Sequence, residues 1–405
     1  MKKDIARYKF VRAVLATFVL AGAAAADEDD DVVPGQVVVK LVEGVDIDVF
    51  IDKYKVEFLD AIESRRTYLV KVKPGDEEEF VDIIVLDPMV ADAEPNFTGR
   101  DIIPDPVGQS IFVASTAGQY ATQPALGKIG LEQAQQTSSG AGVTVAVIDS
   151  GLDPAHPALA GRIAAGGWNF IEGNPNVLDV GDGIDNDMDG FIDESVGHGT
   201  IVSGLIARIA PGAKILPLRV LDSDGYTTTF TMVRAVYYAI DSGAPILNIS
   251  MGTTRETFVI ADAMSEAQQK GVLIVAGAGN EDTSSPVRYP AASSSSVVMA
   301  VAATTNSDIK ADFSNFGGHV SISAPGVKVT SSVPGGGYGA ADGTSYSTPF
   351  VAGTAALVWS KFPQFNAAQV EARLRNTAKN IDLLNPNYAG MLGDGRLNAA
   401  KAVGR

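Results

Sequence analysis

The stretch Gly343-Thr344-Ser345-Tyr346-Ser347-Thr348-Pro349, which runs on into Phe350-Val351-Ala352-Gly353, decides how this chain is interpreted. It places a serine after a glycine, at a turn that leads into an apolar helix expected over residues 351–362. Free backbone N–H groups and the positive end of the helix dipole lie at such a helix start, where they stabilise negative charge developing on a carbonyl oxygen. Pro349 fits, because proline is tolerated in the first turn of a helix. An ordinary capping serine would have the same local sequence, so the interpretation depends on partners elsewhere in the chain.

A serine hydroxyl needs a base to become a good nucleophile, and the usual base is histidine. The chain has 3 histidines. His198 lies in Gly197-His198-Gly199-Thr200, ahead of the apolar run 201–206, and the flanking glycines allow another segment to approach closely. His156 lies in a proline-flanked turn and His319 begins a strand-like run, so structural roles are favoured for these two.

The imidazole in turn needs a carboxylate that fixes its tautomer and stabilises its cation. Residues 143–148 read as a buried parallel strand, and this strand ends on Asp149-Ser150-Gly151. A carboxylate at the carboxyl end of a central strand lies where open α/β sheets place their ligands. Asp149 could also be a simple turn former, which is common after strands.

The order Asp149, His198, Ser345, with these local sequences, resembles that of the subtilisin-like serine proteases. The resemblance runs from about Gly130 to the C-terminus. Further landmarks of the family are Asn248-Ile249-Ser250-Met251-Gly252, Ala276-Gly277-Ala278-Gly279-Asn280, Phe313-Ser314-Asn315-Phe316-Gly317 and Ala324-Pro325-Gly326. The family often has methionine and histidine where this chain has Tyr346 and Phe350. The resemblance implies a serine endopeptidase that hydrolyses peptide bonds in proteins through an acyl-enzyme.

The resemblance also assigns binding residues. It makes Asn280 the side chain of the oxyanion hole, although Gly-Asn is also a frequent turn pair. It makes Ser250, Met251, Gly252, Ala278 and Gly279 the lining of the substrate groove, where small residues let a substrate backbone add as an extra strand. Arg288 falls near a segment that shapes the pocket for the residue preceding the cut. A guanidinium inside that pocket would favour acidic side chains, whereas a solvent-facing arginine would not.

Two other functions compete with an active peptidase. A catalytically silent relative could use the groove to bind peptides, but it would have no reason to keep Asp149, His198, Asn280 and Ser345 together. A lipase-like hydrolase is disfavoured because no Gly-x-Ser-x-Gly elbow surrounds Ser345 and the order of the triad is wrong for that fold.

Composition bounds the remaining possibilities. The chain has 405 residues, is 46% apolar and contains no cysteine, which excludes disulfides and a thiolate nucleophile. Its net charge of −17 and pI of about 4.6 disfavour nucleic acid and anionic membrane surfaces as partners. A monomer is expected as the usual state of the family.

The N-terminus has the pattern of a secretory signal over residues 1–26. A basic region is followed by an apolar core at 13–23 and by Ala24-Ala25-Ala26 as a cleavage site. The apolar stretch is short for a membrane span, which argues against the alternative of an anchor. Secretion is therefore expected.

Residues 27–97 form a separate unit. Their pattern predicts a strand–helix–strand–strand–helix–strand order, with one weak strand near Phe58, as in a small α+β ferredoxin-like domain. This unit resembles the propeptide of subtilisin-like proteases, which implies a folding aid that then inhibits the active site. An independent binding domain is the alternative. Residues 98–122 read as a linker that carries the processing site.

Residues 123–405 are expected to form the peptidase domain. Strands expected near 143–148, 214–221, 245–251, 272–276 and 297–302 alternate with helices expected near 231–242 and 259–269. This alternation predicts an α/β fold, with a parallel central sheet and helices on both faces.

The sequence Asp185-Asn186-Asp187-Met188-Asp189-Gly190-Phe191-Ile192-Asp193 resembles the first part of an EF-hand-type loop. Hard oxygen ligands at this density suit Ca²⁺. Asp185, Asp187, Asp189 and Asp193 are the expected ligands, and Asp179 and Asp182 lie just upstream. Residue Val196 stands where the full motif has glutamate, so a solvated acidic loop is the alternative.

Overall fold

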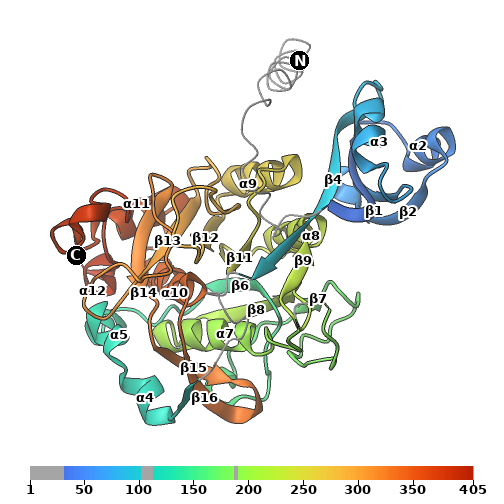
Figure 1. Ribbon diagram of the computed structural model, residues 1–405. Helices are drawn as coiled ribbons and strands as arrows, with labels where there is room; N and C mark the ends of the chain where they lie inside the picture. Colours follow the sequence, from blue (N-terminus) through green and yellow to red (C-terminus); the bar gives the residue numbers. More distant parts are fainter. Residues whose placement is uncertain (1–31, 102–112, 187–189, 405) are drawn as a thin grey trace.

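The computed structural model describes residues 32–101, 113–186 and 190–404 (Figure 1). A small N-terminal domain and a large C-terminal domain are joined by one long strand, β4, which runs from the first domain onto the second. The expected signal segment and the expected ligands Asp187 and Asp189 lie outside the described residues. Among the residues that are described, no helix is long and apolar enough to cross a membrane.

The N-terminal domain has the expected split arrangement of strands and helices. Its elements are β1 (Val32–Leu41), α2 (Ile47–Tyr54), β2 (Glu57–Ile62), β3 (Thr67–Lys71), α3 (Glu77–Ile84) and β4 (Val90–Asp101). The sheet is antiparallel with the order β4-β1-β3-β2. Asp46 caps α2 by accepting a hydrogen bond from the Asp48 backbone, and three glutamates complement the dipole of α3 in its first turn.

Both faces of this small sheet are covered. Alternate side chains of a strand point to opposite faces, and Val37 and Val39 pack with Phe50 of α2 in the domain's own core. Val38, on the opposite face, belongs to the core of the large domain, as does Leu69 of β3. The run Val37-Val38-Val39 is therefore buried throughout because the second face of the sheet docks on the large domain.

The large domain is built on a seven-stranded sheet with the order β14-β13-β12-β10-β6-β8-β7. Every neighbouring pair in it is parallel. The strands are β6 (Thr144–Asp149), β7 (Trp168–Asn169), β8 (Lys214–Arg219), β10 (Ile246–Ile249), β12 (Leu273–Gly277), β13 (Val298–Thr304) and β14 (Val320–Pro325). They read as continuous apolar runs because both faces of a parallel sheet are buried.

Helices cover the two faces, as the sequence predicts. Helices α7 (His198–Ile209) and α10 (Thr344–Lys361) pack together on one face, and α8 (Thr229–Asp241) and α9 (Phe258–Lys270) on the other (Figure 1). Shorter helices complete the domain: α4 (Ala117–Thr122), α5 (Pro124–Lys128), α6 (Leu131–Gln135), α11 (Ala367–Asn376) and α12 (Ala399–Val403).

Two details differ from the sequence-based expectation. Helix α10 begins at Thr344 rather than near residue 351, so Ser345 lies inside its first turn. The segment expected as a linker contains regular structure at both ends: Thr98–Asp101 extends β4, and β5 (Val113–Ser115) pairs with the hairpin β15 (Val329–Val333) and β16 (Gly337–Ala341). Short strands of this kind depend on partners far away in the sequence, which local composition does not reveal.

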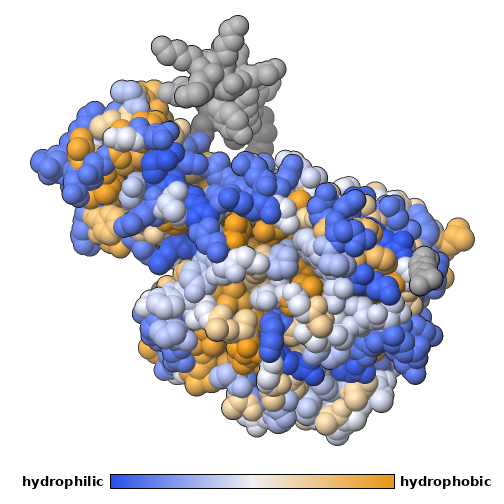
Figure 2. Space-filling view, turned by 180° about the vertical axis from the view of Figure 1, so that it is seen from behind, coloured by the Kyte–Doolittle hydropathy of each residue, from blue (hydrophilic) through white to orange (hydrophobic). Residues whose placement is uncertain are grey.

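On the face shown in Figure 2 the surface is mainly hydrophilic, in keeping with the acidic composition of the chain, and hydrophobic patches interrupt it on both domains. Several large apolar side chains of the N-terminal domain are exposed: Val49, Phe58, Leu59, Ile83 and Leu86.

Candidate active site

Asp149 and His198 meet at the carboxyl edge of the parallel sheet. Asp149 is the last residue of β6, and its Oδ1 accepts hydrogen bonds from His198 Nδ1 at 2.7 Å and from the Ser150 backbone at 2.8 Å. His198 is the first residue of α7, and both side chains are fully buried. This arrangement fixes the imidazole tautomer, with the proton on Nδ1 and Nε2 available as a base.

The glycines around His198 are required by this geometry. Gly197 has φ of 98°, a region that disfavours other residues. A Cβ on Gly199 would lie 2.0 Å from the Gly151 carbonyl oxygen. The Gly-His-Gly pattern therefore lets the start of α7 lie directly against the turn that follows Asp149.

Ser345 is brought to the same place by α10. It is the second residue of that helix, and its hydroxyl donates to the Ser250 carbonyl oxygen at 3.2 Å. The Ser250 hydroxyl donates back to the Ser345 carbonyl oxygen at 3.1 Å. The next side chain, Tyr346, is buried with its ring centroid 5.4 Å from that of His198. The serine-bearing turn thus packs directly against the imidazole.

Asn280 follows β12 and faces the start of α10. Its Oδ1 accepts a hydrogen bond from Thr344 N at 2.9 Å, and the Thr344 hydroxyl accepts one from Gly279 N at 3.3 Å. These two bonds hold the carboxamide of Asn280 beside the N-terminus of the helix that carries Ser345. An amide donor and a helix N-terminus side by side form a site suited to an oxyanion.

The predicted substrate-lining residues form the edge of a strand. Met251 and Gly252 make up β11 (Met251–Gly252), which pairs antiparallel with Arg100–Asp101 at the end of β4. The other side of β4 pairs with β9 (Tyr226–Thr228). The end of the N-terminal domain's last strand therefore lies as an added strand on the segment next to Ser345, as an extended peptide substrate would.

Small residues are necessary around β11 and the loop of Asn280. A Cβ on Gly252 would lie 2.9 Å from the Tyr289 carbonyl oxygen, and a Cβ on Gly279 would lie 2.2 Å from Asn315 Nδ2. Asn315 holds the Asn280 loop, because its Oδ1 accepts from the backbones of Glu281 and Thr283 at 3.1 and 3.0 Å. Ala278, which precedes Gly279, is fully buried.

Arg288 is neither free nor solvent-facing. Its side chain is buried, and its guanidinium pairs with Glu281, with 2.7 Å between Arg288 Nη2 and Glu281 Oε1. The aliphatic part of the Arg288 side chain lies against Gly252 and Gly279. A Cβ on Gly252 would lie 3.4 Å from Arg288 Cβ, and a Cβ on Gly279 would lie 3.0 Å from Arg288 Cγ. Arg288 is therefore one partner of an ion pair rather than a lone cation.

Of the other two histidines, His156 has structural partners. His156 is buried, its Nε2 lies 2.7 Å from the Gly337 carbonyl oxygen, and its Nδ1 accepts from Ala158 N at 3.0 Å. His319 lies directly before the first residue of β14, and burial lowers the pKa of its imidazole.

Sequence reasoning missed one carboxylate of this site. Asp179 is 3% exposed, and its Oδ2 accepts from Gly197 N at 2.8 Å and from the Ser150 hydroxyl at 3.1 Å. Its position in the sequence, just upstream of the acidic loop, associates it with that loop. The structure instead places it between the segments that carry Asp149 and His198. No local motif marks it, because its partners are brought in by β6 and α7.

The acidic loop uses its described carboxylates for internal hydrogen bonds. Asp193 Oδ1 accepts from the backbones of Asp182 and Gly183, at 2.8 and 3.2 Å, and Asp185 Oδ2 accepts from Gly190 at 3.1 Å. Within the described part of the chain, no three His, Asp, Glu or Cys side chains are grouped as metal ligands. The structure thus does not bring Asp185 and Asp193 together with a third described ligand.

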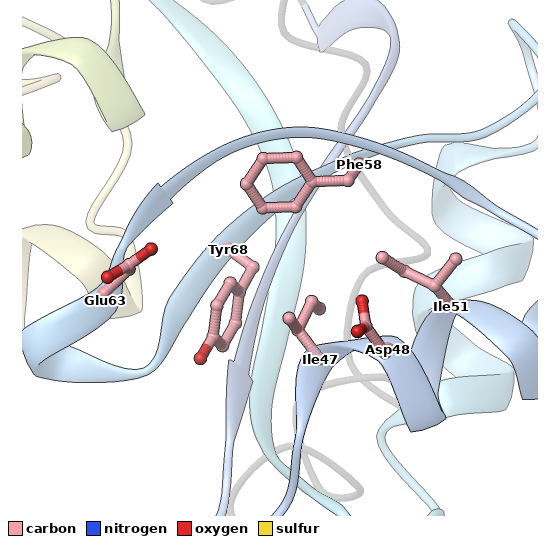
Figure 3. A pocket seen from close by; sticks show the side chains of 6 residues that line it. All are labelled: Ile47, Asp48, Ile51, Phe58, Glu63 and Tyr68. Atoms are coloured by element: carbon pink, nitrogen blue, oxygen red, sulfur yellow. The ribbon is translucent and has the colours of Figure 1, made fainter.

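An open pocket of about 420 Å³ lies elsewhere, between α2 and β2 of the N-terminal domain (Figure 3). Its lining consists of Ile47, Asp48, Ile51, Phe58, Glu63 and Tyr68. None of the residues expected to act in catalysis or substrate binding lines this pocket, so it is not the candidate active site.

Comparison with known proteins agrees with these observations. The model of the subtilase family matches residues 140–397, and a model described as the fervidolysin N-terminal prodomain matches residues 20–96. Thermitase of Thermoactinomyces vulgaris is 35% identical over 295 residues, which are 70% of this chain and 95% of thermitase. Subtilisin NAT of Bacillus subtilis subsp. natto is 37% identical over 255 residues, which are 60% of this chain and 62% of that protein.

A solved structure is similar over both domains. Fervidolysin from Fervidobacterium pennivorans, described as a keratinolytic enzyme related to subtilisin, superimposes with a TM-score of 0.75 at 25% identity. The match covers 94% of this chain and 62% of the fervidolysin chain. The similarity therefore includes the arrangement of the small domain on the large one.

Proposed function

Because the chain belongs to the subtilase family of serine peptidases and carries an N-terminal prodomain, we propose that it is a secreted endopeptidase that matures by cleaving itself. Asp149, His198 and Ser345 are its catalytic triad. The observation that carries this proposal is the 2.7 Å hydrogen bond between buried Asp149 and His198, beside the helix start that holds Ser345.

The reaction follows from the geometry. The Ser345 hydroxyl attacks the substrate carbonyl carbon while His198 Nε2 takes up its proton, and Asp149 stabilises the resulting imidazolium. The oxyanion of the tetrahedral intermediate is bound by the Asn280 side chain and the Ser345 backbone N–H. His198 then gives its proton to the leaving amine, and water hydrolyses the acyl-enzyme by the same steps in reverse.

The substrates are proteins or peptides bound in extended form. The backbone of the substrate adds to the edge of β11, with Ser250, Met251 and Gly252 on one side and Ala278 and Gly279 on the other. The pairing of β4 with this edge supports the mode of binding. A net charge of −17 gives no reason to expect nucleic acid as a partner.

The prodomain acts as an intramolecular inhibitor. The end of β4 occupies the substrate edge, and two side chains of the same strand cap helices of the peptidase domain. Glu94 accepts from Phe258 N and Val259 N, at 2.8 and 3.4 Å, at the start of α9. Asn96 accepts from Phe230 N at 3.2 Å at the start of α8. Such caps satisfy backbone donors that a helix leaves unpaired.

Ion pairs strengthen the docking. Arg65 of the prodomain pairs with Asp241, with 2.6 Å between Nη1 and Oδ2, and also with Glu266. Its guanidinium lies 4.6 Å from the ring centroid of Tyr237. These contacts join the prodomain directly to α8 and α9. They do not depend on the chain connection through the processing region, so the prodomain can remain bound after the chain is cut.

We propose a chain divided into a signal segment (1–26), a prodomain (27–97), a processing region (98–122) and a peptidase domain (123–405). The cut falls after Asp101 and before Val113. Two pairings support this: β4 ends on the substrate edge, and β5 belongs to a sheet of the peptidase domain. The signal segment directs secretion, and the mature enzyme is a monomer.

Calcium is proposed as a structural ion only. Subtilases generally bind structural calcium, and the oxygen-rich loop suits it chemically. Asp185 and Asp193 would contribute oxygens together with Asp187 and Asp189. In binding the ion, Asp185 and Asp193 would exchange some of their backbone hydrogen bonds for metal bonds. The ion would steady the loop that leads to His198, and it takes no part in the chemistry.

Intact mass measurement tests the proposed function. Wild type and Ser345→Ala are expressed without residues 1–26. Wild type is expected to lose a segment that ends between residues 101 and 113, whereas the Ser345→Ala chain stays whole. Two whole chains would instead indicate a peptide-binding relative or maturation by another protease. Casein hydrolysis after treatment with a trace of protease separates these two outcomes.

A further inference from the structure

Asp179 is a buried carboxylate that the catalytic triad does not include. It is 3% exposed, and it lies just beyond a bridge between Leu152 and Leu178, where its backbone donates to the Leu152 carbonyl oxygen at 3.2 Å. A buried ionisable group is costly unless it is paired or hydrogen-bonded. The partners that satisfy it therefore show what it does.

Those partners are the two segments that carry the acid and the base. Asp179 Oδ2 accepts from Gly197 N at 2.8 Å, from the Ser150 hydroxyl at 3.1 Å and from the Thr200 hydroxyl at 3.4 Å. Gly197 directly precedes His198, and Ser150 directly follows Asp149. One carboxylate oxygen thus joins the turn after β6 to the start of α7.

Ser150 completes the connection. Its backbone donates to Asp149 Oδ1 at 2.8 Å, and its hydroxyl accepts from Gly199 N at 3.0 Å. The residues before and after His198 are therefore both held, one by Asp179 directly and the other through the Ser150 hydroxyl. A displacement of this helix start would move the imidazole relative to Ser345.

Charge adds to this mechanical role. Burial first, and then the neighbouring Asp149, raise the pKa of Asp179 to about 7, while its hydrogen bonds and Arg219 act in the opposite direction. Arg219 of β8 donates to the Leu178 carbonyl oxygen at 2.8 Å. The charged groups that act on Asp179 are therefore Asp149 from β6 and Arg219 from β8.

We propose that Asp179 is a positioning residue of the peptidase reaction, which locks the His198 segment to the Asp149 segment and, when it is ionised at neutral and higher pH, supplies a second buried negative charge beside Asp149. This role rests on the proposed function, because it matters only if His198 cycles through its cation. Asp179 touches neither the substrate nor the reacting atoms.

Two substitutions separate the hydrogen bonds from the charge. Asp179→Asn keeps an oxygen acceptor and removes the charge. The acid limb of its profile of kcat/KM against pH is expected to move to lower pH by less than about 1 unit, which is below the full effect of a neighbouring charge because Asp179 is only partly ionised near pH 7. Asp179→Ala removes the acceptor as well, and kcat is expected to fall about 10- to 100-fold with KM unchanged, as for a small misplacement of a reacting group.

Asp153→Asn is the matched control. Asp153 is also a buried carboxylate beside α7, but it accepts from Ala155 N and Gly335 N, at 2.9 and 3.0 Å, rather than from the Asp149 and His198 segments. Its pH profile is expected to match that of wild type. Ser150→Ala provides a second test, because it breaks the same connection from the other end and should lower kcat without raising KM.

A readout independent of turnover uses the downfield NMR signal of the His198 Nδ1 proton, followed against pH in the Ser345→Ala background. Asp179→Asn is expected to shift the midpoint of this titration, and Asp153→Asn is not. An unchanged midpoint together with an unchanged kcat/KM profile in Asp179→Asn overturns the inference. A shifted midpoint in Ser345→Ala, together with no peptide cleavage by the chain that keeps Ser345, supports the coupling of Asp179 to His198 and refutes the proposed peptidase function.

Discussion

The contact of Glu94 with helix α9 predicts that the prodomain is released as pH rises. Glu94 is 4% exposed, and its carboxylate caps the first turn of α9 through Phe258 N and Val259 N. Burial raises its pKa from 4.5 to about 7, more than these two hydrogen bonds lower it. On an undocked prodomain the same side chain would be in water and would keep its ordinary pKa.

The sign and the size follow from proton linkage. The docked state has the higher pKa, so it binds the proton more tightly, and docking is strongest below pH 4.5. Docking weakens as pH rises from 4.5 through about 7 and is then constant. Because one pKa unit corresponds to 1.36 kcal/mol, the full change is about 3 kcal/mol, or roughly 300-fold in the undocking equilibrium.

Hydrogen exchange in full-length Ser345→Ala measures this equilibrium without self-cleavage. Protection factors of the Phe258 and Val259 amides, corrected for intrinsic exchange, are expected to fall by up to about 300-fold between pH 4.5 and 8. Glu94→Gln mimics the protonated side chain, so it should abolish the pH dependence and keep high protection at pH 8. A pH dependence that persists in Glu94→Gln, or a wild-type protection that stays flat, would refute the reasoning.

Three further outcomes are expected. Asn280→Ala should lower kcat by roughly 10²–10³-fold with little change in KM, the range measured for such a donor in a family member; equal kcat values would remove Asn280 from the oxyanion hole. Glu281→Gln should free the Arg288 guanidinium and raise kcat/KM for peptides cut after glutamate relative to matched glutamine peptides, with an unchanged ratio counting against a place in the specificity pocket. Excess chelator should lower the melting temperature of Ser345→Ala if the loop of Asp185 and Asp193 binds calcium, and an unchanged melting curve would contradict that site.

Much of this fold could be predicted from local sequence. The parallel strands are apolar runs because both of their faces are buried, and the strand near residues 272–276 was placed correctly for that reason. The split arrangement of the prodomain was likewise confirmed, including the weak strand β2 near Phe58. The sequence predicts a start for α10 that is too late, because the polar residues Thr344 to Thr348 are typical of a turn. In the structure these residues are buried and belong to the helix.

The candidate site likewise has a part that local sequence predicts and a part that it does not. Local sequence was enough to identify the residues that could carry the chemistry. A strand end precedes Asp149 directly, a Gly-His-Gly turn contains His198, and a helix start contains Ser345. Asp149 was expected at the edge of the sheet where open α/β folds bind their ligands, and its proximity to His198 and Ser345 was implied by the resemblance to the subtilisin-like serine proteases.

The tertiary structure, by contrast, sets how these residues are supported and regulated. It buried Asp179 between the acid and base segments, paired Arg288 with Glu281, and placed Glu94 on the start of α9. Each of these side chains has an unremarkable local sequence, and its partners are distant in the chain or lie on another element. Their charges and pKa values depend on burial and on neighbours brought together by folding, which no local pattern encodes.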